Sequence, residues 1–173
     1  DDIRIKNRNQ VLEKKAYVDL QTGLPNKSKC EEMLNNYEYI TEPMGFVMFD
    51  LNNLKRANDT YGHAVGDQLI TNFARLLRNA IPAKDFVGRY GGDEFIAIIT
   101  QTTKNEILKI MDEVHDEVRN FNENIHKVEV SYAYGYAFSE DYADCTIKTL
   151  FDKADKHMYE NKAIEKAKFE AIV

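Results

Sequence analysis

The hydrophobic positions of the chain form short apolar runs and longer runs with helical spacing. Residues 46–49 (FVMF) are a continuous apolar run, which predicts a buried strand leading directly into Asp50. Two β-prone runs, 86–87 and 95–99, are joined through Gly91-Gly92, which predicts a hairpin whose glycines adopt the positive φ of tight turns. The acidic pair after the glycines is then expected at the hairpin tip, and it consists of Asp93 and Glu94.

A further strand is predicted for residues 128–138, where two kinds of side chain alternate strictly. Valine and aromatic side chains share one face, and mostly small side chains share the other. We expect another element to approach closely on the small face. The tyrosines on the opposite face are expected to cover the core and the sheet edge.

Apolar residues recur at helical spacing between these strands. The first helix has the weakest pattern, and its expected buried positions are Val11, Leu12 and Ala16. Asn26 is placed to cap one helix, and Gly62 to end a short one. The predicted helices are 3–18, 27–39, 54–60, 68–81, 102–121 and 147–166. This order predicts an α+β fold, in which helices pack on a central, mostly antiparallel sheet.

Length and composition restrict the class of protein. The chain has 173 residues, 43% of them hydrophobic and 30% charged, which are values typical of one globular domain. A net charge of −6 disfavours a nucleic-acid polymer as partner, although a small anion could bind beside local cations. No apolar run approaches the ~20 residues of a membrane span, so we expect no membrane contact by this chain.

The two cysteines and the first residues suggest the cellular context. Cys30 and Cys145 are far apart in sequence, which fits a reduced cytoplasmic protein or the cytosolic part of a membrane-anchored sensor. The chain begins at Asp1 rather than methionine, which suggests a piece of a longer protein. Residues 1–18 could lie on the domain or could end a signalling helix from an upstream sensor domain. We predict a signalling-type helix at 1–18 and one domain at 19–173.

Three carboxylates are expected near one edge of the sheet. Asp50 ends one predicted strand, and Asp93 and Glu94 begin another, so the three converge if those strands are neighbours. Hard oxygen ligands suit Mg²⁺, and two such ions can align an attacking oxygen and a leaving group at phosphorus. The short helix near Leu54 offers free N–H groups to an anion such as a triphosphate. An ordinary solvated acidic turn is the alternative interpretation of residues 93–94.

Other polar residues could bind a nucleotide. Asn58 and Asp67 carry groups that could read guanine, although helix capping and turn formation also explain them. His63 could contact the same ligand or be a loop histidine with a packed ring. Three lysines could bind phosphate, although a solvated surface charge is the simpler explanation for each one taken singly. They are Lys55, Lys162 and Lys166.

Four segments carry a resemblance to a known family. They are 19–27 (DLQTGLPNK), 49–67, 88–95 (GRYGGDEF) and 154–162 (ADKHMYENK). In order and spacing they resemble the GGDEF family of diguanylate cyclases, over nearly the whole chain after residue 18. The resemblance implies a ferredoxin-like sheet related to the palm of polymerases and nucleotide cyclases. It also implies a homodimer in which each subunit presents one GTP, and two GTP condense into cyclic di-GMP with loss of pyrophosphate.

The resemblance also implies roles for particular residues. Mg²⁺, or Mn²⁺, would be held by Asp50, the Leu51 carbonyl, Asp93 and Glu94. Asp93 would be the acid–base group at the 3′-hydroxyl, with Glu94 as the second candidate. Guanine would be read by Asn58, His63 and Asp67. The other substrate-binding positions would be Lys55, Gly91, Gly92, Lys162 and Lys166, with the lysines neutralising phosphates.

The sequence departs from the family pattern at several positions. Asn52 stands where many members have a second aspartate, and we expect only a modest effect on metal binding. Gln21 replaces a usual leucine, which we interpret as a packing detail. Lys166 stands where arginine is common and would bind phosphate less directionally. Product-inhibited members usually carry Arg-x-x-Asp where this chain has PAKD at 82–85, so weak or absent product inhibition is predicted.

Two alternatives to a diguanylate cyclase stay open. The first is a catalytically silent module that binds GTP and regulates another protein. The second is a nucleotidyl cyclase with another base preference. Asp67 favours guanine, because adenine lacks the pair of donors that a carboxylate needs.

Overall fold

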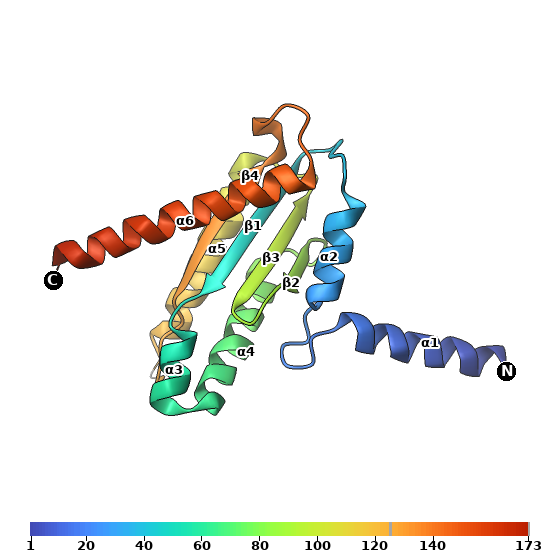
Figure 1. The fold of residues 1–173 in the computed structure, drawn as a ribbon, viewed down its shortest axis with the longest axis horizontal. Helices are drawn as coiled ribbons and strands as arrows, with labels where there is room; N and C mark the ends of the chain where they lie inside the picture. The colour runs from blue at the N-terminus through green and yellow to red at the C-terminus, as the bar shows by residue number, and fades with distance from the viewer. Residues whose placement is uncertain (125, 173) are drawn as a thin grey trace.

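The computed structural model describes residues 1–124 and 126–172, which fold around a four-stranded antiparallel sheet (Figure 1). The strand order is β2-β3-β1-β4, and each neighbouring pair is antiparallel. The strands are β1 (Met44–Leu51), β2 (Phe86–Arg89), β3 (Glu94–Thr100) and β4 (Tyr132–Phe138). The predicted α+β class is confirmed.

Helices cover both faces of the sheet. Figure 1 shows α2 and α6 in front of the strands and α4 and α5 behind them. The helices are α1 (Asp2–Tyr17), α2 (Lys27–Asn36), α3 (Leu54–Tyr61), α4 (His63–Ala80), α5 (Lys104–Asn122) and α6 (Ile147–Ile172), with a short 3-10 helix at Ser139–Asp141. None of these helices, within the described residues, is long and apolar enough to cross a membrane.

Side chains of β1 alternate between two hydrophobic cores. Val47 and Phe49 pack in the core beneath α4 and α5, whereas Phe46 and Met48 pack in the core beneath α2 and α6. Because both faces are covered, every position of the run 46–49 is apolar. The same two-sided burial explains the continuous apolar run of β3.

Strand β4 is shorter than predicted and begins at Tyr132 rather than at residue 128. Val130 instead pairs with the end of α5, since its N–H donates to Asn122 Oδ1 (2.9 Å) and its carbonyl accepts from Asn122 Nδ2 (2.8 Å). The predicted close approach of another element to the small-residue face of β4 is confirmed, and that element is α6. A Cβ at Gly135 would lie 2.1 Å from the Ala154 carbonyl oxygen and 2.2 Å from the Met158 nitrogen, both on α6.

Several predicted helix boundaries and burials were wrong. Helix α4 begins at His63, five residues earlier than predicted, because Val65 and Gly66 are buried in its first turn rather than placed in a polar loop. Helix α2 ends at Asn36 rather than at 39, while α6 continues past 166. Val11, Leu12 and Ala16 are exposed, because α1 extends away from the sheet instead of lying on it (Figure 1).

The central hairpin forms as predicted, but for a different backbone reason. Residues 90–93 connect β2 to β3, and the N–H groups of Tyr90 and Gly91 both donate to the Glu94 carbonyl, at 2.8 and 3.1 Å. Among the described glycines, only Gly23 and Gly62 have positive φ. The expectation of positive φ at Gly91 and Gly92 was therefore wrong, since a four-residue connection turns the chain without it.

Candidate active site

Three carboxylates meet where β1 ends and β3 begins. Asp50 is the register partner of Glu94 on the neighbouring strand. The Leu51 N–H donates to the Asp93 carbonyl oxygen at 2.8 Å, which ties the hairpin to the end of β1. The condition for the predicted convergence, that the strands ending near Asp50 and beginning at Glu94 are neighbours, is confirmed.

The carboxylates form a concentration of negative charge. Burial, and then the charge of Asp50, raise the pKa of Asp93, while a hydrogen bond from Asp93's own backbone lowers it. Burial, and then Asp50 and Asp93, raise the pKa of Glu94. Asp50 Oδ2 contacts the Lys162 ammonium, whereas its Oδ1 is buried without a hydrogen-bond partner among the described residues. A second cation at Asp50 Oδ1 would relieve this repulsion.

The donor set fits an open Mg²⁺ site rather than a closed one. Within residues 1–124 and 126–172, no three His, Cys, Asp or Glu side chains are arranged as a complete metal site. Mg²⁺ commonly takes one or two protein carboxylates and completes its shell with water and phosphate oxygens. The unpartnered oxygen of Asp50 and the adjoining Asp93 meet that requirement, so a phosphate ligand would complete the site.

A second group of polar residues lies at the corner between α3 and α4. The Asn58 side chain packs against Gly66, where a Cβ would come within 1.7 Å of Asn58 Oδ1. That oxygen is buried and has no hydrogen-bond partner among the described residues, so the side chain caps no helix here. His63 and Asp67 lie one turn apart on α4, and both are exposed. Asn58 thus lies where α3 packs against α4, the helix that carries His63 and Asp67.

The predicted phosphate-binding lysines occupy different places. Lys162 on α6 reaches across to Asp50 and joins the carboxylate site. Lys166 lies one turn further along α6, and Lys55 lies in the first turn of α3; both are exposed. The structure therefore brings Lys162 into the candidate site and leaves the other two on nearby helical surfaces.

Comparison with known proteins assigns the family. A family model described as diguanylate cyclase, GGDEF domain, matches residues 16–168. The chain belongs to the GGDEF domain family. Diguanylate cyclase A of Treponema denticola is 27% identical over 165 residues, covering 90% of this chain and 46% of that protein. The cyclic di-GMP phosphodiesterase PdeR of Escherichia coli is 28% identical over 166 residues, covering 94% of this chain and 24% of that protein.

The chain thus spans half or less of the length of these curated relatives. Among solved structures, the coiled coil and GGDEF domain of DgcB from Caulobacter crescentus, in complex with c-di-GMP, has a TM-score of 0.81. Its identity is 21%, and the match covers 92% of this chain and 87% of that one. At this identity the likeness establishes the fold, which confirms the predicted palm-like cyclase sheet.

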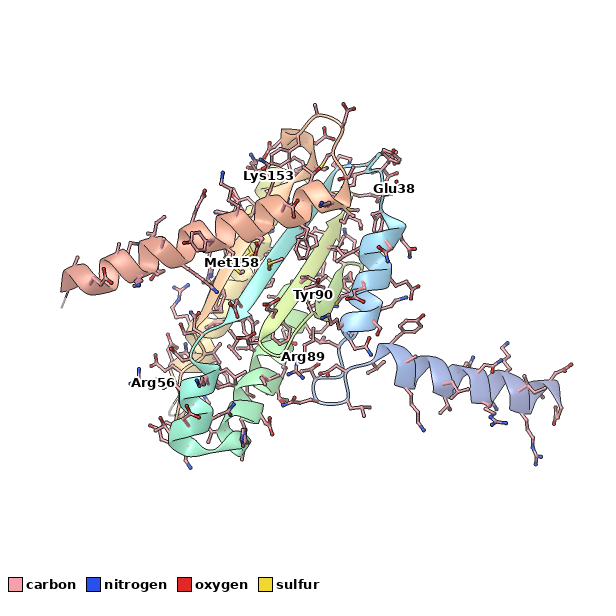
Figure 2. All side chains as sticks on the ribbon, viewed as in Figure 1. Glu38, Arg56, Arg89, Tyr90, Lys153 and Met158 are labelled. Carbon is pink, nitrogen blue, oxygen red and sulfur yellow. The ribbon has the colours of Figure 1, made fainter. Side chains whose placement is uncertain are left out.

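The GGDEF hairpin is held by Arg89, a residue that the sequence prediction missed. Figure 2 shows Arg89 between the hairpin and the loop that joins α1 and α2. Its Nη2 donates to the Gly92 carbonyl at 2.8 Å, and its Nη1 lies 3.1 Å from an oxygen of Asp19. The only sequence signal was a basic residue directly before the glycines of the hairpin, with an acidic residue in a distant Gly/Pro loop.

Two departures from the GGDEF pattern have structural explanations. The Asn52 side chain donates to Ser131 Oγ at 3.1 Å, and its N–H donates to the Ser131 carbonyl at 2.8 Å. Asn52 therefore fastens the end of β1 to the segment before β4. Gln21 is exposed and makes polar contacts with Arg89 and Asp67, so its interpretation as a packing detail was wrong.

Asp85, the surviving residue of the 82–85 segment, is buried within the domain. Its Oδ1 accepts from the Thr100 N–H at 3.0 Å and from Lys84 Nζ at 3.1 Å. Its side chain is 0% exposed, so it closes the hairpin rather than facing a ligand.

We therefore expect saturating cyclic di-GMP to leave the initial rate of GTP turnover unchanged. Proline replaces the usual arginine at residue 82, and the Asp85 side chain is fully buried, with its Oδ1 bonded to the Thr100 N–H. Initial rates of pyrophosphate release with and without added product measure this directly. Inhibition that disappears in an Asp85→Asn variant would contradict the prediction.

Proposed function

We propose that this GGDEF domain is a Mg²⁺-dependent diguanylate cyclase that condenses two GTP into cyclic di-GMP and two pyrophosphates as a homodimer. The observation that carries the proposal is the convergence of Asp50, Asp93 and Glu94 on adjoining strands, with one buried, unpartnered carboxylate oxygen. In a longer protein, an upstream sensor domain would control how the two subunits meet.

In each condensation the 3′-oxygen of one GTP attacks the α-phosphorus of the other. The new bond forms as the bond between that phosphorus and the pyrophosphate oxygen breaks. Asp93 accepts the proton of the 3′-hydroxyl; burial, and then the charge of Asp50, raise the pKa of its carboxyl, which makes it a stronger base. Glu94 is the second candidate for this role. Because each subunit presents one GTP, both bonds form only across the dimer.

Other side chains of this chain orient and neutralise the substrate. Lys162 would exchange its contact with Asp50 for a phosphate, and Lys55 and Lys166 would add positive charge around the triphosphate. Gly91 and Gly92 would let the substrate approach the hairpin backbone. Mg²⁺ or Mn²⁺, when held by Asp50, the Leu51 carbonyl, Asp93 and Glu94, would supply Lewis-acid stabilisation of the phosphate oxygens.

Guanine would be read at the corner of α3 and α4. The Asp67 carboxylate can accept from the ring N–H and the exocyclic amine of guanine, which together form a donor pair that adenine lacks. Asn58 Oδ1 has no hydrogen-bond partner among the described residues, which supports a polar role for Asn58 at this corner. His63, one turn from Asp67 on α4, would line the same pocket.

Asp67→Ala should lower kcat/KM for GTP by roughly 10- to 100-fold and reduce the preference for GTP over ATP. The loss follows from leaving the guanine donor pair without an acceptor. Pyrophosphate release with each nucleotide measures both effects, and Asp152→Ala, an exposed acid on α6, is the charge-matched control. Unaltered selectivity would remove Asp67 from base recognition.

The second candidate function is a catalytically silent module that binds GTP and regulates another protein. The observation that favours it is the ion pair between Lys162 and Asp50, which places an ammonium at the proposed metal ligand. The two candidates differ in one outcome, because both bind GTP but only the cyclase forms cyclic di-GMP.

A further inference from the structure

The side chain of Gln21 joins the loop between α1 and α2 to two other elements. Its Oε1 accepts from Arg89 Nη1 at 2.9 Å, and its Nε2 donates to Asp67 Oδ1 at 3.0 Å. Arg89 lies at the end of β2, and Asp67 lies on α4. One amide therefore connects the end of β2, next to the tip of the GGDEF hairpin, with the candidate guanine-reading carboxylate, which is 46 residues from Gln21 in sequence.

Neighbouring contacts fix the orientation of this amide. Arginine carries only donors, so the amide oxygen must face Arg89 and the amide nitrogen must face Asp67. Arg89 is itself held by the Asp19 carboxylate and by the Gly92 carbonyl. A leucine at position 21, which is usual in this family, could make neither polar contact.

We propose that Gln21 is a positioning residue that orients the Asp67 carboxylate for guanine. The proposal rests on the proposed function, because it requires Asp67 to read the base. A carboxylate has about four lone-pair sites, so Gln21 takes one of them and leaves acceptors for both guanine donors. Because the carboxylate is already fixed before GTP binds, less side-chain conformational entropy is lost on binding.

Gln21→Leu should weaken binding of a non-reactive GTP analogue, with methylene between the α and β phosphorus, by about three- to tenfold. The contact is exposed, which keeps the effect in this range. Binding of the matching ATP analogue should be unchanged, because adenine does not use Asp67. Calorimetric titration of the whole chain with each analogue measures both values, and restored GTP-analogue affinity in Gln21→Asn would further support polar positioning.

The double variant distinguishes positioning from a merely structural role. In an Asp67→Ala background, Gln21→Leu should cause no further loss of GTP-analogue binding, because the proposed effect of Gln21 on guanine passes through that carboxylate. Additive losses, equal losses for both analogues, or unchanged GTP-analogue binding in Gln21→Leu alone would each overturn the proposal. Unchanged GTP-analogue binding in Asp67→Ala alone would overturn guanine reading by Asp67 as well, so the two failures are separable.

Discussion

Replacing Asp93 with asparagine is expected to reduce cyclic di-GMP formation by about 10³-fold or more, while the fold is retained. Asparagine keeps the shape of the side chain but can neither accept the 3′-hydroxyl proton nor bring a negative charge to a metal. Asp93 lies in the connection between β2 and β3 and is not part of either core, so its loss removes little packing. Product formation by the purified variant measures the effect.

The same variant should be more stable than the wild-type chain at neutral pH without divalent ions. The pKa of Asp93 is raised above its ordinary value of 3.8, mainly by burial and then by Asp50. The charged form is therefore disfavoured in the fold, and stability falls as pH rises from the unfolded pKa through the folded one. Asparagine removes this cost, so the difference in Tm should vanish below pH 3.8.

Two outcomes would contradict this account of Asp93. Full activity in Asp93→Asn would remove it from the mechanism. A lower Tm at neutral pH would show that the carboxylate stabilises the fold instead of being strained by its neighbours. Asp152→Asn on α6 provides the matched control, because it removes an equal charge from an exposed surface.

Gly135→Ala is expected to destabilise the domain by about 3 kcal/mol or more. Its Cβ would lie 2.1 Å from the Ala154 carbonyl oxygen and 2.2 Å from the Met158 nitrogen. These are backbone atoms of α6, so no side-chain rotation can relieve the overlap, and β4 and α6 must separate. Figure 2 shows Met158 on the side of α6 that faces the sheet. The expected fall in Tm is roughly 6–12 °C.

Gly92→Ala is the matched control for this prediction. A Cβ there meets nothing within 4 Å, and Gly92 lacks positive φ, so the free energy of unfolding should change by less than about 0.5 kcal/mol. Denaturant unfolding of both variants compares them directly. Equal stability of Gly135→Ala and the wild-type chain would show that β4 and α6 pack less closely than described.

The strands and their carboxylates could be predicted because burial on both faces leaves a strong sequence pattern. The run 46–49 is apolar at every position, and the polar stretch that begins at Asp50 indicates that the strand ends close to this residue. Once β1 and β3 are neighbours, Asp50 must lie beside the start of β3, where Glu94 stands. The roles of these residues in catalysis stay predictions.

Contacts between distant segments could not be predicted, because no local pattern encodes them. Arg89 is held by residues about 70 positions away, and sequence spacing gives no indication of that pairing. The predicted start of β4 was too early. The sequence alternates through residues 128–131 as a strand would, but the Val130 N–H bonds to Asn122 of α5 instead of to a neighbouring strand. The early start of α4 depends on Gly66, whose missing side chain leaves room for Asn58.

Product analysis tests the central claim most directly. The chain, held as a dimer by a fused parallel coiled coil, is incubated with GTP and Mg²⁺, and the nucleotides are analysed by chromatography and mass spectrometry. We expect cyclic di-GMP with two pyrophosphates per molecule, and about 10³-fold less or lower still in a parallel sample of Asp93→Asn. A forced dimer that binds GTP but forms no cyclic di-GMP would contradict the cyclase and favour a silent GTP-binding module.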